Sequence, residues 1–397
     1  METMRTIQPA KRLSGLTSAI FTEMNRRKRI IQARGMEVID LGIGSPDQPP
    51  SPLVMEALTR AVQNPDNYGY PTSEGSVRFR ETTARWYRHR FGVELDPECE
   101  VLSLMGSQDG LAHLAQAWVN PGDVVLVPDP GYPIYFASVT LAGGEVYPLP
   151  LREENNFLPD LSNIPTEIKN RAKLMVLNYP NNPVAAIATE DFFAEVVAFA
   201  TSNRMIVAHD LAYSELAFDG YRPPSFLETP GAKEIGVEFN SFSKSFNMAG
   251  CRIGYLVGNS EVIKSLAIIK SNIDYGVFLA VQEAAVAAME HDIEHPEENG
   301  NGILYQTRRD VLLDGLREIG WNIPKPKATM FVWARVPSGW TSETFAFTLL
   351  EKAGVVVIPG NAFGVQGEGY VRIALVKSVD VLKDVITRIK ESGILFT

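Results

Sequence analysis

The chain has 397 residues, of which 45% are hydrophobic and 21% are charged, and its formal net charge is −10. This length predicts two or three domains with a large core, and the acidic charge argues against nucleic acid or an anionic membrane as the main partner. Two cysteines, no secretory signal over residues 1–11 and no apolar run of membrane-spanning length indicate a reduced, cytoplasmic protein.

The N-terminal part predicts helical character over residues 1–35 and a short strand at 38–41 that leads into a glycine-containing turn. Gly44 lies in this turn, where the missing side chain lets the backbone approach a ligand. The third glycine of a dinucleotide fingerprint is absent and Pro46 blocks the helix that should follow, which excludes a nucleotide-binding turn. Helices are expected at 52–61 and 77–91, with a turn-rich segment at 68–75 between them.

Ser107 and Gln108 stand at the start of a predicted amphipathic helix. Apolar residues recur behind them at the spacing of one helix face, at Leu111, Leu114, Ala115 and Trp118. The free N–H groups and the dipole at such a helix start favour an anion. The alternative is that Ser107 only caps the helix.

From residue 124 onward, short buried strands alternate with helices, which is typical of a largely parallel sheet covered on both faces. Strands are expected at 124–127, 146–149, 174–177 and 205–208, with a helix at 190–200. Functional residues of such a sheet gather at the carboxyl ends of its strands. Motifs with polar and aromatic residues stand there: Tyr132 in DPGYP, Asn178 and Asn182 in NYPNNP, and Asp210 and Tyr213 in HDLAY.

Lys244 lies among serines in a loop predicted between two buried strands, at 235–242 and 253–257. An amine held in a partly desolvated site has a lowered pKa and attacks carbonyl groups more readily. Ser241, Ser243 and Arg252 are the partners that a phosphate dianion needs. A lysine beside a phosphate site indicates a Schiff base to pyridoxal phosphate, and the alternative is a solvated surface loop.

Pyridoxal chemistry has further requirements, and the chain offers a residue for each. Asp210 is the acid that keeps the pyridine nitrogen protonated, and Tyr213 and Asn182 are donors to the phenolic oxygen. Tyr132 is the aromatic that lies against the ring face. The expected phosphate site consists of the N–H groups near Ser107 and Gln108, together with Ser241 and Arg252.

The C-terminal part predicts a smaller α+β unit. A helix at 277–290 runs into the acidic segment 291–302, the best candidate for a linker. His291, Glu294 and His295 match a zinc-protease spacing, but Pro296 ends the helix and no third ligand is evident, so no metal is expected. Helices at 305–319 and 341–353, strands at 330–334, 355–358 and 370–375, and a final helix with one apolar face complete the unit.

The ordered set GSQDG, DPGYPxY, NYPNNP, HDLAY, SxSKSxNMAGxRIGY and YVRIAL resembles class I and II aminotransferases of pyridoxal-phosphate fold type I. The resemblance covers nearly the whole chain. It implies an α/β fold with a mostly parallel seven-stranded sheet between helices and a smaller α+β domain. The expected division is an N-terminal arm at 1–45, a cofactor-binding domain at 46–290 and a small domain at 291–397.

The resemblance also assigns roles that the residues alone do not give. Arg372 matches the arginine that grips the substrate carboxylate, unless it is a buried structural pair, and Gly44 and Asn182 are expected beside the substrate. Ser243 is expected to line the cofactor site, and Asn178 either lines it or is a turn asparagine. Tyr70 matches a tyrosine that reaches the phosphate of the neighbouring subunit's cofactor, which implies a homodimer with shared sites.

The implied reaction moves an amino group between an L-amino acid and a 2-oxo acid in a two-stage cycle, with Lys244 as the general base. Segments such as GIGSPDQPPSP and YGYPTSEG most resemble the bacterial LL-diaminopimelate aminotransferase branch. Val184 with Ala185, and Cys251, depart from the family pattern without removing a catalytic group. The alternatives are a C–S β-lyase on the same fold and a cofactor-binding regulator, for which the first 35 residues are too short to supply a DNA-binding region.

Overall fold

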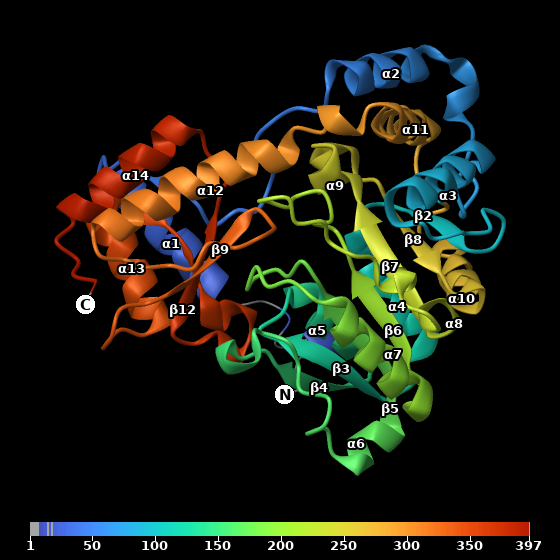
Figure 1. The fold of residues 1–397 in the computed structure, drawn as a ribbon, viewed down its shortest axis with the longest axis horizontal. Coiled ribbons are helices and arrows are strands. Elements are labelled where there is room, and N and C mark those ends of the chain that lie inside the picture. Colours follow the sequence, from blue (N-terminus) through green and yellow to red (C-terminus); the bar gives the residue numbers. More distant parts are fainter. Residues whose placement is uncertain (1–7, 14–15, 17–18, 397) are drawn as a thin grey trace, which may run out of the picture.

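The computed structural model describes residues 8–13, 16 and 19–396 of the chain. The helical character expected near the N-terminus appears as η1 (Lys11–Leu13) and α1 (Ala19–Ala33), and residues 1–7 of that prediction lie outside the described residues. Figure 1 shows a large part built on a twisted sheet and a smaller part in which α1 lies among the C-terminal helices.

A seven-stranded sheet forms the centre of the large part (Figure 1). Its strands follow the order β2 (Val101–Leu104), β8 (Gly254–Gly258), β7 (Gly236–Ser241), β6 (Ile206–Asp210), β5 (Ala172–Asn178), β3 (Val124–Asp129) and β4 (Glu145–Pro150). Strand β8 runs antiparallel to both of its neighbours, β2 and β7, and all other pairs of the sheet are parallel. Every residue of β2, β3, β7 and β8 is buried, as expected for a sheet that helices cover on both faces. The mostly parallel seven-stranded sheet predicted from the sequence is confirmed.

Helices surround this sheet, and the signals at their ends explain where they begin and end. In α3 (Val77–Phe91), the hydroxyl of Ser76 accepts a hydrogen bond from the N–H of Phe79, and Gly92 ends the helix with a left-handed φ of 69°. The other helices of this part are α2 (Pro52–Gln63), α4 (Ser107–Trp118), α5 (Pro133–Ala142), α6 (Thr166–Arg171), α7 (Glu190–Asn203), α8 (Ala232–Ile235), α9 (Phe242–Ser245), α10 (Ser260–Ser271) and α11 (Leu279–Glu294). Strand β2 and helices α8, α9 and α10 had not been predicted, and α5 and α6 had been expected only as helical segments between strands, without bounds.

The smaller part holds two short sheets. Strand β1 (Ile39–Asp40) pairs with β10 (Val355–Val356), which brings the N-terminal segment beside the C-terminal one. The second sheet has the antiparallel order β11 (Ile358–Pro359), β12 (Tyr370–Ala374) and β9 (Phe331–Arg335). Helices α12 (Asn301–Glu318), α13 (Ser342–Ala353) and α14 (Val379–Glu391) pack with these strands. The domain boundaries expected at residues 45 and 290 stay a prediction.

The expected linker at 291–302 is mostly helical. Helix α11 continues to Glu294, a single turn η6 follows (Pro296–Glu298), and α12 begins at Asn301. The remaining single turns are η2 (Pro65–Tyr68), η3 (Glu153–Asn155), η4 (Phe226–Glu228), η5 (Ala249–Cys251), η7 (Gly360–Phe363) and η8 (Val365–Gly367). Pro296 ends α11 because proline cannot donate the next hydrogen bond, but the chain resumes helical structure within a few residues.

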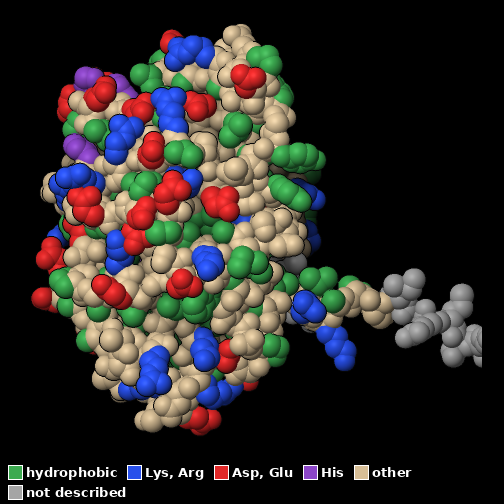
Figure 2. Space-filling model, turned by 90° about the vertical axis from the view of Figure 1, so that its right-hand side faces the viewer, with side chains coloured by type: hydrophobic (Ala, Val, Ile, Leu, Met, Phe, Trp, Pro, Cys, Tyr) green, Lys and Arg blue, Asp and Glu red, His purple; other side chains and the backbone are tan. Residues whose placement is uncertain are grey.

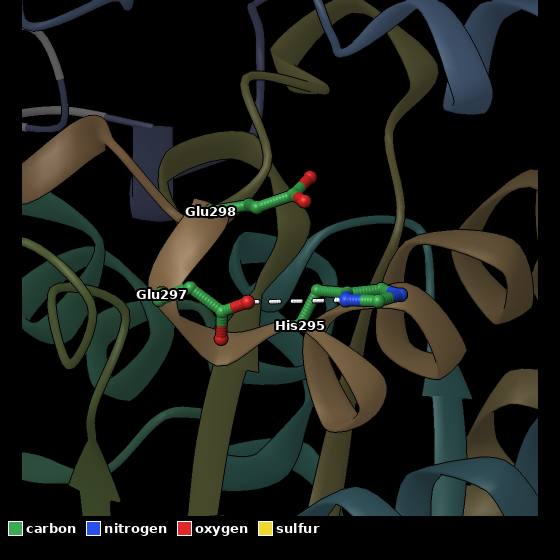
Figure 3. A group of neighbouring side chains, drawn as sticks. All are labelled: His295, Glu297 and Glu298. Atoms are coloured by element: carbon green, nitrogen blue, oxygen red, sulfur yellow. Dashed lines mark ion pairs between the residues drawn. The ribbon is translucent and has the colours of Figure 1, made fainter.

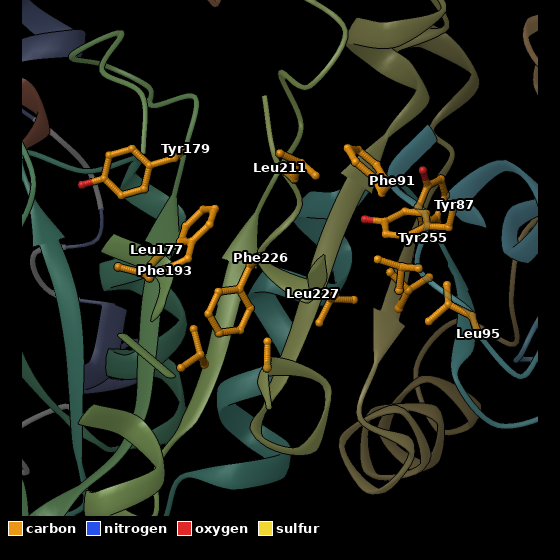
Figure 4. Packing of buried hydrophobic residues seen from close by; sticks show 14 of the residues in the cluster. Tyr87, Phe91, Leu95, Leu177, Tyr179, Phe193, Leu211, Phe226, Leu227 and Tyr255 are labelled. Atoms are coloured by element: carbon orange, nitrogen blue, oxygen red, sulfur yellow. The ribbon is translucent and has the colours of Figure 1, made fainter. Parts of the chain in front are cut away.

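A large apolar cluster packs against the sheet and holds its strands in place (Figure 4). Tyr87, Phe193, Phe226 and Tyr255 are among its buried aromatic side chains. On the face in Figure 2, Lys and Arg side chains are interspersed with Asp and Glu, without a patch of one sign. None of the helices in the described part of the chain combines the length and the apolar character needed to cross a bilayer.

Candidate functional site

A cavity of about 210 Å³ lies at the carboxyl ends of β5, β6 and β7, where the parallel strands of the large sheet end. All predicted site residues except Tyr70 line this cavity, and Asn178, Leu111, Tyr135, Ala212 and Phe331 line it as well. The structure therefore brings together residues that lie up to 328 positions apart, from Gly44 to Arg372. Of the added residues, Tyr135, Leu111, Ala212 and Phe331 had not been identified from the sequence.

Lys244 lies on α9, a single helical turn between the paired strands β7 and β8, rather than in a loop. Its Nζ donates a hydrogen bond to the carbonyl oxygen of Gly44 at 2.8 Å. Burial, followed by the positive charges of Arg372 and Arg252, lowers the pKa of Lys244 to about 8, against the opposing effect of Asp210. A pKa of about 8 makes the neutral amine, the nucleophilic form, far more abundant near neutral pH than in an exposed lysine.

Asp210 ends β6 and is buried in the cavity wall. Burial raises the pKa of its carboxyl group, and hydrogen bonds from the Tyr135 hydroxyl at 2.8 Å and the Ala212 N–H at 3.2 Å oppose that rise. Tyr135 comes from α5 and was missed, although it is the last residue of the DPGYPIY motif, three positions after Tyr132. That spacing places both tyrosines on one side of a helix start.

One end of the cavity combines a helix N-terminus with a guanidinium group. Ser107 and Gln108 are the first two residues of α4, so their N–H groups lack partners within the helix. A side-chain carbon on Gly106 would lie 2.6 Å from Nη2 of Arg252, so the arginine packs directly on this glycine. Ser241 and Ser243 line the same cavity, and the Ser241 hydroxyl accepts a hydrogen bond from the N–H of Ser243 at 3.2 Å. Such donors suit a phosphate dianion.

Arg372 projects from β12 into the cavity and is buried. Its Nη1 donates to Oδ1 of Asn182 at 2.8 Å and its Nη2 to the carbonyl oxygen of Gly42 at 2.7 Å, whereas its Nε has no partner. Burial lowers the pKa of this guanidinium to about 10. Among the described residues, no carboxylate pairs with Arg372, so a buried cation without a counterion lines the cavity. An anionic group of a ligand would neutralise the charge of the Arg372 guanidinium and would accept the hydrogen bond that its Nε does not make within the protein.

Asn182 links this arginine to the aromatic wall. Its Nδ2 donates to the Tyr213 hydroxyl at 3.4 Å, and its own N–H donates to Oδ1 of Asn178 at 2.7 Å. Asn178 therefore both lines the cavity and holds the turn, so its two expected roles coexist. Tyr132 donates its hydroxyl hydrogen to Oε1 of Gln108 at 3.0 Å, which ties the ring to the start of α4.

The departures from the family pattern leave the site intact. Ala185, where the family often has glycine, takes a left-handed φ of 55°, and its N–H still closes the turn onto the carbonyl oxygen of Asn181 at 3.0 Å. Such a conformation costs an alanine about 1–2 kcal/mol. Cys251 is half-buried in η5, directly before Arg252.

Tyr70 is the predicted site residue that does not reach the cavity of its own chain. It is 92% exposed, and its ring lies 5.8 Å from that of Tyr275, which is also exposed. Its expected contact with a neighbouring subunit stays a prediction.

The residues with the zinc-protease spacing in the sequence, His291, Glu294 and His295, are not the ones whose potential ligand atoms lie together in the structure. His295, Glu297 and Glu298 place one ligand atom each within 4.8 Å of one another, and all three are exposed (Figure 3). Glu294, the acid of the sequence pattern, is not part of this group. His295 and Glu297 form a loose ion pair at 3.9 Å, while Glu298 accepts from His291 at 3.0 Å. The expected absence of a metal stays a prediction.

Comparisons with known proteins give this site its context. The family model for aminotransferase class I and II matches residues 36–389. The LL-diaminopimelate aminotransferase of Moorella thermoacetica is 50% identical over 384 residues, which cover 97% of this chain and 98% of that protein. The substrate-bound BacF structure from Bacillus subtilis is 39% identical with a TM-score of 0.93, and the match covers 99% of both chains.

A mutant of Thermus thermophilus aspartate aminotransferase is 28% identical with a TM-score of 0.90, and the match covers 98% of this chain and all of that one. The fold type I architecture predicted from the sequence is thus confirmed. The predicted resemblance is confirmed over nearly the full length, and so is the prediction of an enzyme. The chain belongs to the class I and II aminotransferase family and is an enzyme of the transaminase class.

Proposed function

We propose that this aminotransferase uses pyridoxal phosphate to move an amino group between LL-diaminopimelate and a 2-oxo acid such as 2-oxoglutarate. The observation that carries the proposal is the placement of three groups around one cavity: the half-buried amine of Lys244, the buried carboxyl of Asp210 and the buried guanidinium of Arg372. A nucleophilic amine, an acid and a carboxylate-binding cation are the groups that this chemistry needs.

The residues that line the cavity fit the cofactor. Lys244 would hold it covalently, and Asp210 would pair with its ring nitrogen, because Asp210 is a buried carboxyl with no cation bonded to it among the described residues. The N–H groups of Ser107 and Gln108, the hydroxyls of Ser241 and Ser243 and the guanidinium of Arg252 would hold the phosphate. Tyr213 and Asn182 would bond to the phenolic oxygen, and Tyr132 would lie against the ring.

Three side chains of the protein would carry out the reaction. When bound, the cofactor supplies an aldehyde that accepts the amino group and a ring that withdraws electrons. Arg372 binds the substrate carboxylate through Nε and its fork of donors, which fixes the Cα–H bond toward Lys244. Nζ of Lys244, whose pKa is about 8, then takes the proton from Cα and returns it as general acid. Asp210 stays anionic and holds the proton on the ring nitrogen.

The substrate proposal rests on the named relatives. Several proteins that are 44–50% identical to the chain carry the name LL-diaminopimelate aminotransferase. We also infer a homodimer, supported by exposed aromatic side chains at Tyr68, Tyr70 and Tyr275 on one segment of the surface. A cytoplasmic location is supported by the two free cysteines, Cys99 and Cys251.

The test is an absorption titration of the purified protein. Wild-type protein reconstituted with pyridoxal phosphate should show a visible cofactor band that Lys244→Ala lacks. Adding LL-diaminopimelate should convert the band to the pyridoxamine phosphate spectrum, and 2-oxoglutarate should restore it. Aspartate, alanine and methionine serve as competing donors, and the best donor by kcat/KM names the substrate.

Each part of the proposal has its own contradicting result. If the reconstituted wild type shows no cofactor band, the cofactor assignment is wrong. If aspartate or methionine exceeds LL-diaminopimelate in kcat/KM, the substrate assignment is wrong although the reaction class stands. Release of pyruvate and ammonia without a 2-oxo acid would support the β-lyase alternative, which no feature of the cavity favours.

A further inference from the structure

Lys270 is a fully buried lysine that the proposed mechanism does not use. It stands in the last turn of α10, and its side chain is 0% exposed. Its Nζ contacts two carboxylates, Oδ2 of Asp109 at 2.7 Å and Oδ2 of Asp274 at 2.8 Å. Buried lysines are rare because removing the ammonium from water is costly, so its position calls for a role.

Asp109, the first partner of Lys270, lies in the first turn of α4, next to the proposed phosphate site. Ser107 and Gln108 precede it, and its Oδ2 also accepts a hydrogen bond from the N–H of Met105 at 3.0 Å. A negative carboxylate at this position cancels part of the positive potential at the start of the helix, and it repels a phosphate dianion. The helix start therefore serves an anion well only if the charge of Asp109 is compensated.

The compensation comes from behind the helix, away from the cavity. Lys270 and the imidazole of His113, whose Nδ1 lies 2.9 Å from Oδ1 of Asp109, are the groups that face this carboxylate from α10 and α4. Although burial raises the pKa of Asp109, His113 and Lys270 lower it to about 2, so the carboxylate is charged at any physiological pH. Of the two partners, Lys270 forms an ion pair with Asp109 at 2.7 Å from a position without solvent exposure.

The second carboxylate holds Lys270 in place and extends the network. Oδ1 of Asp274 accepts a hydrogen bond from the N–H of Gly276 at 2.8 Å. Gly276 packs on the backbone of Thr72, where an added side-chain carbon would lie 2.4 Å from the carbonyl oxygen. Thr72 belongs to the segment that carries Tyr70. Lys270 thus joins the start of α4 to the segment proposed to contact the neighbouring subunit.

We propose that Lys270 is a positioning residue for phosphate binding: it neutralises Asp109 and so leaves the start of α4 free to hold the phosphate of the cofactor. The inference rests on the proposed placement of the phosphate at Ser107 and Gln108. It predicts that Lys270 affects a cofactor that carries a phosphate far more than the same ring system without one.

The test compares the dissociation constants of pyridoxal phosphate and pyridoxal, measured by absorbance on the apoprotein. In Lys270→Met, which keeps most of the apolar stem of the side chain, the dissociation constant of pyridoxal phosphate should rise at least about tenfold, because the two carboxylates that pair with Lys270, one of them beside the phosphate site, lose their cation. That of pyridoxal should change less than about twofold. The double variant with Asp109→Asn should return to within about threefold of wild type, since the carboxylate next to the phosphate site is removed together with the lysine, and Asp274 remains on the far side of the network.

Two further variants separate this role from general damage. Arg309→Met removes another buried cation, one that pairs with Asp219 and Asp310, and should lower thermal stability without changing the ratio of the two constants. If Lys270→Met does not fold, Asp109→Asn still tests the inference. This variant removes the carboxylate beside the phosphate site, so it should bind pyridoxal phosphate at least as tightly as wild type.

Equal weakening of both ligands in Lys270→Met would overturn the inference. So would a double variant weaker than the single one, or weakened binding of pyridoxal phosphate in Asp109→Asn. A wild-type protein that fails to bind pyridoxal phosphate would instead contradict the proposed function, and the inference would fall with it.

Discussion

The hydroxyl of Tyr135 donates a hydrogen bond to Oδ2 of Asp210 at 2.8 Å, and both side chains are buried. Burial alone raises the pKa of a carboxyl, and this bond works against that rise because it stabilises the charged form. Asp210 can therefore remain anionic beside the ring nitrogen of a cofactor. Tyr135 thus supports the chemistry of Asp210 without reaching for the substrate itself.

Tyr135→Phe should lower kcat by about ten- to a hundredfold, since a hydrogen bond to a charged group contributes about 1.5–3 kcal/mol. Without the donor, the pKa of Asp210 rises, so the carboxylate is lost at a higher pH than in wild type. The acid limb of the kcat profile should accordingly move to higher pH. Tyr132→Phe is the matched control because its hydroxyl bonds to Gln108, and an equal movement of its acid limb would contradict the assignment.

The depressed pKa of Lys244 predicts how the apoprotein captures pyridoxal phosphate at different pH values. Only the neutral amine reacts, so the second-order rate should rise with pH and level off above about 8, instead of climbing toward 10.5. Arg372→Met removes a positive charge that disfavours the ammonium form, so the pKa of Lys244 rises and the midpoint moves to higher pH. Arg335→Met, an exposed arginine, should leave the midpoint unchanged. A wild-type midpoint near 10 would show that the amine is not desolvated in solution.

Arg372→Lys should raise KM for every amino acid substrate more than it lowers kcat. Lysine keeps the positive charge but loses the planar fork and the free Nε that suit a carboxylate. Loss of one charge-assisted hydrogen bond predicts a fall in kcat/KM of about ten- to a hundredfold. Steady-state kinetics with a donor amino acid and with its 2-oxo acid should show the same loss, because one clamp serves both. A loss confined to one of them would mean that Arg372 binds something else.

Much of the site was predictable because its residues sit in short, ordered motifs at strand ends. Lys244, Asp210 and Asn182 could each be placed from a motif, since a parallel sheet gathers such ends at one edge. Tyr135 was missed because its role depends on the direction in which α5 leaves β3, which local patterns do not define. Strand β2 was missed because it is the shortest strand of the large sheet, with four residues against five to seven in the others, and Ser103 interrupts its apolar run.

For residues 291–302, in contrast, a conformation was predicted and was wrong. The acidic, glycine-containing composition of this segment predicted a linker, but α11, the single turn η6 and α12 together take up most of it. Composition describes how well a segment is hydrated, whereas here tertiary contacts decide its conformation: Asn301 donates to the carbonyl oxygen of Ser245 at 2.9 Å and accepts from Nδ2 of Asn247 at 3.0 Å. Such partners come from distant positions, and a single sequence does not reveal them.

Tyr70 provides the sharpest test of a shared active site. It is 92% exposed in its own chain, whereas an aromatic hydroxyl is usually placed where it finds a polar partner. If Tyr70 completes the site of the neighbouring subunit, Lys244→Ala and Tyr70→Phe should complement each other. In a hybrid dimer, the subunit with Tyr70→Phe keeps its own Lys244 and receives an intact Tyr70 from its partner.

The hybrid should therefore contain one intact site and one site that lacks both groups. Two-tag purification of the co-expressed variants should yield about half of the wild-type kcat per dimer, with wild-type KM. Each parent homodimer should stay impaired: Lys244→Ala because it has no amine, and Tyr70→Phe because its cofactor binds more weakly. If Tyr70 acted within its own chain, the hybrid would show no activity above that of the parents, since each subunit would still carry a damaged site.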